Sequence, residues 1–194
     1  SSRRRHTRFR NVTGVQTCAL PISAAATFGV AHPTGYPLFT ILGHAWSMIS
    51  TDVSWMNLLA GVWCAIAVGA AYALMLEVLS LLRGGFTTSH RFASAATALM
   101  LGFSGLVWSQ ATSLEVYSLH LCLLTLTLLC VVKSLQDNAD VSRWSALSGM
   151  LYGLMLANHL SSAFLAPGIL LLWLSASRKG QIRSWYIVVG PVLL

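Results

Sequence analysis

The sequence predicts an all-α fold, a multi-pass bundle of transmembrane helices, and two observations lead to this prediction. Of the 194 residues, 56% are hydrophobic and only 9% are charged, with a mean hydropathy of +0.70. A soluble domain usually carries about a quarter charged residues, so this chain has too few to cover a water-facing surface. In addition, two apolar segments are longer than the roughly 20 residues that a helix needs to cross a bilayer.

The apolar segments follow one another along residues 23–194, which we assign to the membrane domain. Residues 38–49 are too few to span and predict an interfacial or re-entrant helix. Residues 55–82 are long enough to cross with tilt, and Asp52 and Ser54 offer caps at their start. The other predicted segments are 92–108, 114–135, 144–157, 160–174 and the beginning of one more at 185–194, which gives about six or seven helices.

Residues 1–22 differ from everything after them and are interpreted as a non-native, disordered tail. Five of the twelve Lys and Arg residues lie in the first ten positions, so the rest of the chain has 7 basic against 5 acidic side chains. No basic patch remains for a nucleic acid. The apolar run before Ser23 is too short for a signal peptide and contains Pro21. The tail resembles a translated sequencing adapter, which implies that the natural N-terminus is missing and the chain is a fragment.

The basic residues of the body predict the orientation in the membrane. If each segment crosses once, they all fall in loops on one side, and the positive-inside rule makes that side cytoplasmic. These residues are Arg83, Arg91, Lys133, Arg143, Arg178, Lys179 and Arg183. The loop 29–37 and the turns near 52, 115 and 158 then face the opposite, exoplasmic side. Glu77 lies toward the cytoplasmic half and is expected to pair with a basic residue.

The candidate site consists of polar residues that this topology brings to the exoplasmic face. A carboxylate and an imidazole there suit general-base activation of a hydroxyl, so Glu115 and His32 are the predicted catalytic residues. Phenol, amide and imidazole groups suit phosphate or sugar binding. The predicted substrate-binding residues are Tyr36, Tyr117, Asn158 and His159. No metal-ligand spacing or cofactor motif is present, and the four cysteines predict neither a zinc site nor a disulfide framework.

Structural roles remain open for several of these residues. Thr112 and Glu115 have the spacing of a capping box at a helix start, which is as good an explanation as catalysis. Asn158 and His159 also suit a turn that ends a helix. His120 is interpreted as a residue that hydrogen-bonds inside the bundle.

Three stretches of the sequence resemble a known family. They are Gly29-Val30-Ala31-His32-Pro33-Thr34-Gly35-Tyr36-Pro37-Leu38, the segment 108–117 with Glu115-Val116-Tyr117, and Asn158-His159. Together they are similar to a family of multi-pass membrane proteins, long of unknown function, that includes the O-mannosyltransferase of plexin-type receptor domains. The resemblance covers residues 23–194 and implies the N-terminal part of a GT-C-type glycosyltransferase. Such enzymes take a sugar from a polyprenyl-phosphate carrier at the exoplasmic face.

The chain departs from the family at two places. Thr34 stands where members usually have Pro, and the acidic Asp-x-Gly-Glu motif that precedes the loop in the family is absent. That motif carries the family's expected catalytic base and would fall where the tail stands. The resemblance therefore implies a glycosyltransferase lineage, and we expect this chain on its own to be inactive.

The leading hypothesis is a membrane glycosyltransferase that moves a sugar, with mannose as the candidate, to a protein or glycan hydroxyl. Its partners would be membrane lipid, the polyprenyl-phosphate sugar and the acceptor, with no nucleic acid. No cofactor is expected, because the lipid-linked sugar is the donor substrate. We expect a bacterial inner membrane rather than the endoplasmic reticulum. The alternatives are a transporter or flippase-like protein without covalent chemistry, and a non-catalytic assembly subunit.

Overall fold

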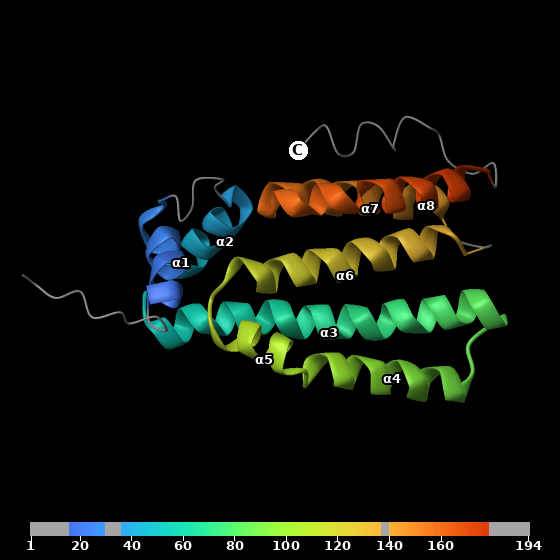
Figure 1. Ribbon diagram of the computed structural model, residues 1–194, viewed down its shortest axis with the longest axis horizontal. Helices are drawn as coiled ribbons and strands as arrows, with labels where there is room; N and C mark the ends of the chain where they lie inside the picture. Colours follow the sequence, from blue (N-terminus) through green and yellow to red (C-terminus); the bar gives the residue numbers. More distant parts are fainter. Residues whose placement is uncertain (1–15, 30–35, 137–139, 179–194) are drawn as a thin grey trace, which may run out of the picture.

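The computed structural model describes residues 16–29, 36–136 and 140–178, and every regular element within them is helical. The elements are α1 (Gln16–Thr27), α2 (Pro37–Ser47), α3 (Val53–Arg83), α4 (Thr88–Gly102), α5 (Gly105–Thr112), α6 (Val116–Ser134), α7 (Val141–Asn158), the 3₁₀ helix η1 (Leu160–Leu165) and α8 (Ala166–Arg178). Figure 1 shows α4, α3, α6 and α7 side by side, with α1 and α2 at one end of the bundle. The prediction of an all-α membrane bundle is confirmed.

Two helices in the described part of the chain, α3 and α6, are long and apolar enough to span a membrane. They match the predicted spans 55–82 and 114–135. The α3 helix starts at Asp52, whose carboxylate accepts the N–H of Ser54 at 2.9 Å and that of Trp55 at 3.3 Å. It ends at Gly84, which has a left-handed φ of 74° that favours glycine. Local signals therefore define both ends of the longest helix.

The predicted helix over residues 92–108 is wrong as a single element. The α4 helix ends at Gly102, α5 begins at Gly105, and the two are bent by 60°. Ser104 stabilises the interruption between α4 and α5. Its hydroxyl donates to the Leu101 carbonyl at 2.7 Å and accepts the Val107 N–H at 3.3 Å. Serine competes with helical hydrogen bonds in this way, and glycine on each side lowers the helix propensity further. Together the pair makes up a third span if it is counted as one.

The structure also contradicts the predicted disorder of the tail over residues 16–22, which lie in α1. Alanine-rich sequence runs across the predicted boundary and favours a helix. The α1 helix packs against α2, where His44 Nδ1 donates to the Ala25 carbonyl at 3.0 Å. Residues 1–15 lie outside the described residues, and the non-native origin of the tail stays a prediction.

The remaining predicted segments are partly confirmed. The short helix at 38–49 is α2, with 11 residues. The segment 144–157 is α7, which starts three residues earlier, and 160–174 divides into η1 and α8. The segment that was expected to begin at 185 lies outside the described residues.

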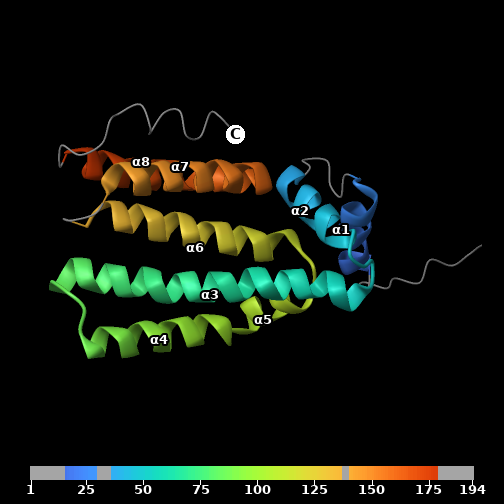
Figure 2. The same cartoon turned by 180° about the vertical axis from the view of Figure 1, so that it is seen from behind.

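The basic residues gather at one end of the bundle. Arg83 ends α3 and Arg178 ends α8, while Arg91 and Arg143 lie in the first turns of α4 and α7. Because α3, α4, α6, α7 and α8 alternate in direction, these ends lie together in both views (Figures 1 and 2). Lys179 and Arg183 lie outside the described residues.

Glu77 is paired as expected. Its carboxylate is 2.9 Å from Lys133 Nζ in the last turn of α6 and accepts Gln136 Nε2 at 3.0 Å. This small network joins α3 to α6 at the basic end, where the Lys133 ammonium also lies 4.8 Å from the centre of the Trp144 ring. A partly buried carboxylate at this position is therefore compensated by an ion pair and an amide.

Candidate functional site

The opposite end of the bundle gathers three side chains around the imidazole of His159. The His159 ring centre lies 5.7 Å from that of Tyr36, 5.7 Å from that of Tyr117 and 5.5 Å from that of His120. We call these four residues the His159 cluster. Phenol and imidazole groups donate and accept hydrogen bonds, so the cluster suits a phosphate or a sugar hydroxyl.

Three separate parts of the chain supply the cluster. Tyr36 precedes α2, and Pro37 begins that helix without needing its missing N–H. Tyr117 and His120 are one turn apart on α6 and therefore share a helix face. His159 ends α7, where Ser161 donates its hydroxyl to His159 Nδ1 at 2.6 Å and so helps to orient the ring. The structure thus brings together the predicted residues Tyr36, Tyr117 and His159.

His120 is the residue that sequence reasoning missed. It was interpreted as a structural histidine, yet its ring contacts His159 and its buried Nδ1 has no hydrogen-bond partner in the described part of the chain. Its spacing of three residues from Tyr117 is the signal that could have found it. The other predicted catalytic residue of the loop, His32, lies outside the described residues.

Asn158 occupies a structural position beside the cluster. Its side chain is fully buried and donates through Nδ2 to the Val116 carbonyl at 3.3 Å. This bond ties the end of α7 to the beginning of α6. The Asn158 Oδ1 atom is buried without a partner in the described residues. The predicted contact of Asn158 with substrate stays a prediction.

Glu115 stands at the start of α6, but its carboxylate does not cap the helix. No cap hydrogen bond is present, and the hydroxyl of Thr112 donates instead to the Trp108 and Ser109 carbonyls at 3.2 Å. The capping box that the sequence left open is therefore not formed. Burial raises the pKa of the Glu115 carboxyl above its ordinary value, because the charged form loses solvation. A proton acceptor with a raised pKa is a stronger base.

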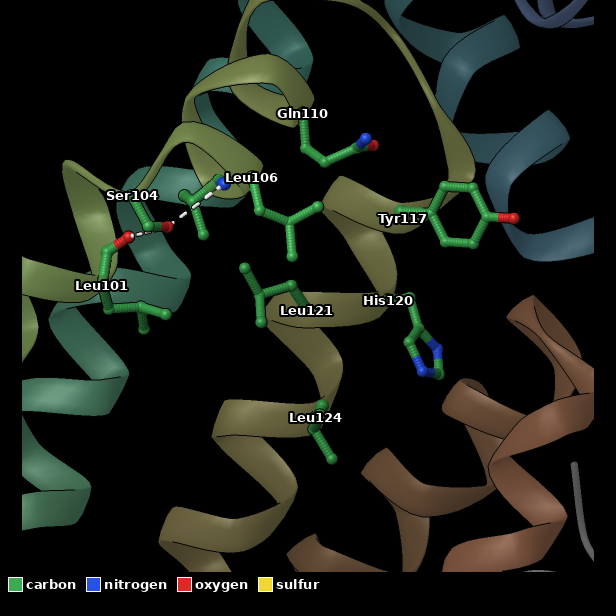
Figure 3. A pocket seen from close by; sticks show the side chains of 9 residues that line it. Leu101, Ser104, Leu106, Gln110, Tyr117, His120, Leu121 and Leu124 are labelled. Carbon is green, nitrogen blue, oxygen red and sulfur yellow. Dashed lines mark hydrogen bonds between the residues drawn. The ribbon is translucent and has the colours of Figure 1, made fainter.

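An apolar pocket of about 400 Å³ adjoins the cluster. It is lined by Leu101, Ser104, Leu106, Val107, Gln110, Tyr117, His120, Leu121 and Leu124. Figure 3 shows leucines from both walls facing one another, with Gln110, Tyr117 and His120 along one edge. The pocket lies between the broken α4–α5 pair and α6, and Ser104 at the bend is one of its lining residues. Tyr117 and His120 belong to both the pocket and the cluster.

The polar edge of the pocket contains unused hydrogen-bonding capacity. Gln110 Oε1 and His120 Nδ1 are both buried and have no partner in the described residues. A buried polar atom without a partner costs about 1–3 kcal/mol, so such atoms usually mark a place for a ligand or a water molecule. Among the described residues, no three His, Cys, Asp or Glu side chains are arranged to hold a metal ion.

The helices and the cluster define the class of the protein, an integral membrane protein with an all-α bundle and a polar site at one end. The family model described as Protein O-mannosyl-transferase TMEM260 N-terminal domain matches residues 18–182, and the chain belongs to this family. The resemblance inferred from the sequence is therefore confirmed. No solved structure matches the chain.

Two curated relatives are named protein O-mannosyl-transferase TMEM260. The protein from Mus musculus is 29% identical over 78% of this chain and 22% of its own length. The protein from Dictyostelium discoideum is 31% identical over 59% of this chain and 13% of its own length. The chain thus spans less than a quarter of the relatives that it matches. Both relatives are eukaryotic, so they do not support the expected bacterial inner membrane.

Proposed function

We propose that the chain forms part of a GT-C-type membrane glycosyltransferase that takes mannose from a polyprenyl-phosphate carrier. The acceptor is a hydroxyl group of a protein or glycan, and the reaction takes place at the exoplasmic face. The observation that carries this proposal is the His159 cluster beside an apolar pocket. The names of the relatives support the same chemistry.

The pocket and the cluster suit the two halves of such a donor. Leucines from α4, α5 and α6 offer an apolar surface for the part of an isoprenoid chain nearest the phosphate. Imidazole and phenol groups lie where Tyr117 and His120 reach the edge of the pocket, and they can donate hydrogen bonds to phosphate oxygens. The pocket therefore suits the apolar isoprenoid chain of the donor, and the adjoining His159 cluster suits its anionic phosphate.

In this proposal the acceptor hydroxyl gives its proton to Glu115, and not to the acidic residue that the resemblance implies upstream of the loop 29–37. The hydroxyl oxygen then bonds to the anomeric carbon of the sugar, the bond from that carbon to the phosphate oxygen breaks, and the polyprenyl phosphate leaves. Burial around Glu115 raises its pKa and makes it a better base than an exposed glutamate. His32, on the loop 29–37, is proposed to assist at the phosphate.

The test is transfer of radiolabelled mannose from polyprenyl-phosphate mannose to an acceptor protein. It uses membranes that contain the chain joined to the parts of the Mus musculus relative that lie outside the matched region. We expect Glu115→Gln to reduce the rate by about 10²- to 10⁴-fold, as for a general base, and His159→Ala to raise the KM for the donor. Unchanged transfer in both variants would remove Glu115 and His159 from the site.

A transporter or flippase-like protein is the second candidate, and the bend between α4 and α5 is the observation that favours it. Interrupted helices near the middle of a membrane often form transporter binding sites. Uptake of a labelled lipid-linked sugar into vesicles without formation of a sugar–acceptor bond would support this candidate. Covalent transfer to the acceptor, which the first proposal requires, would exclude it as the main activity.

A further inference from the structure

Two asparagine side chains hold the backbone on either side of Glu115. The Leu114 N–H donates to Asn57 Oδ1 of α3 at 2.9 Å. On the other side, Asn158 Nδ2 of α7 donates to the Val116 carbonyl at 3.3 Å. These are the two asparagines in the described part of the chain. Both act on the same short segment, residues 114–116, although they come from different helices.

The backbone partners determine which end of each amide is used. An N–H can only donate, so Asn57 must present its oxygen to Leu114. A carbonyl can only accept, so Asn158 must present its NH₂ group to Val116. Position 57 therefore requires an acceptor and position 158 requires a donor. Aspartate keeps an acceptor but lacks the donor, so it should be tolerated at position 57 and not at position 158.

These contacts do more than complete a helix end. Glu115 has extended backbone angles, and its carboxylate makes no cap bond, so local structure does not set the direction of its side chain. Leu114 is fully buried, and without Asn57 its N–H would lack an acceptor. Asn158 is also fully buried, and its Oδ1 accepts no hydrogen bond from any residue that the structure describes, which lowers stability. A costly buried amide next to a candidate base is more typical of a functional position than of a packing position.

We propose that Asn57 and Asn158 are positioning residues that fix residues 114–116 and thereby the direction of the Glu115 carboxylate. The effect on transfer rests on the proposed function, because the direction of this carboxylate changes the rate only if Glu115 accepts the proton. The effect on the local environment of Glu115 does not depend on that function.

The chain offers a direct readout, since Glu77 and Glu115 are its two glutamates. Glutamate labelled with ¹³C at the side-chain carboxyl carbon, Cδ, gives two resonances when the full chain is placed in lipid nanodiscs. The resonance that disappears in Glu115→Gln belongs to Glu115. We expect Asn57→Leu, Asn158→Leu and Asn158→Asp to shift or broaden the Glu115 resonance, and Asn57→Asp to preserve it. Gln136→Leu is the matched control, because it removes an amide bonded to Glu77 and should move only the Glu77 resonance.

The same variants are then measured in the transfer assay. We expect those that disturb the Glu115 resonance to lower kcat on the order of 10- to 100-fold with the donor KM unchanged, and Asn57→Asp to retain activity. A Glu115 resonance that is insensitive to both leucine variants would overturn the proposal, as would a disturbed resonance with unchanged kcat. If these variants disturb the Glu115 resonance while the wild-type protein transfers no sugar in the assay, the positioning is upheld and the proposed function is refuted.

Discussion

At the scale of single residues, the imidazole of His159 joins α7 to the start of α6 and to Tyr36. Within the described residues its three ring neighbours come from two distant parts of the chain, and its Nδ1 already accepts a hydrogen bond from Ser161. The other ring nitrogen, Nε2, is therefore the atom that could serve a ligand. The ring of His159 packs against its neighbours and Nε2 is available to a ligand, so a substitution can test ligand binding separately from packing.

His159→Phe separates the ring contacts from the nitrogen. Phenylalanine keeps an aromatic ring between Tyr36 and Tyr117 but loses the hydrogen bonds that His159 Nδ1 accepts from Ser161, so we expect the free energy of unfolding to fall by about 0.5–2 kcal/mol. The donor KM should rise, because no hydrogen bond to the ligand remains. Chemical unfolding and transfer kinetics measure the two effects. A variant with wild-type KM would show that the nitrogen has no part in donor binding.

Glu115 gives the site a predicted pH dependence. Burial raises the pKa of its carboxyl, so the folded protein holds this proton more tightly than the unfolded chain does. Below its ordinary pKa, the Glu115 carboxyl is protonated in both states and does not lower the free energy of unfolding. As the pH rises through the raised pKa, the buried carboxyl becomes charged and the free energy of unfolding falls. We expect Glu115→Gln to be more stable than wild type at neutral pH and to lose this advantage at acidic pH. Thermal unfolding across this range tests the sign, and equal stability at every pH would contradict the raised pKa.

The catalytic pH profile follows from the same residue. As a base, Glu115 acts only when deprotonated, so the rate should rise with pH through its raised pKa. The acidic limb of the profile should then lie at higher pH than for an exposed glutamate, and Glu115→Gln should abolish it. A limb that persists in the variant would belong to another group.

At the scale of elements, close packing of α1 on α2 depends on Gly43. A Cβ at this position would lie 2.8 Å from the Cβ of Ala25, which is closer than carbon atoms can approach. We expect Gly43→Ala to lower the free energy of unfolding by about 1–3 kcal/mol through overpacking. Gly69→Ala in α3 is the control, since a Cβ added there would have nothing within 4 Å and alanine favours helix. Denaturant unfolding in detergent compares them, and equal effects would contradict the packing of α1.

The elements also show what sequence can predict and where it fails. The α3 helix was predicted within two residues because its signals, Asp52, a long apolar run and Gly84, are local. The bend at Ser104 was missed, because apolar content continues through it and only the glycines on each side of Phe103 and Ser104 mark it. Similarly, Tyr36, Tyr117 and His159 were assigned to one face from topology. The amide contacts of Asn57 and the role of His120 depend on tertiary packing, which no local pattern reveals.

At the scale of the whole molecule, antiparallel helices separate two kinds of polar residue. The basic side chains and the Glu77–Lys133 pair lie at one end, and the His159 cluster and Glu115 lie at the other (Figures 1 and 2). If the basic end is cytoplasmic, as the positive-inside rule requires, the site opens to the exoplasmic side. The proposed donor, acceptor and base all depend on this orientation.

Cysteine labelling from one side of a sealed vesicle tests the orientation most directly. Thr112 at the end of α5 and Ser89 at the start of α4 are exposed, and they mark the two ends of the bundle. Cys64, Cys122 and Cys130 are buried, so the parent chain with Cys18→Ser is a suitable background. We expect a membrane-impermeant maleimide to label Thr112→Cys from the exoplasmic side and Ser89→Cys only after the membrane is opened. Labelling of both variants from the same side would contradict this orientation and the site that depends on it.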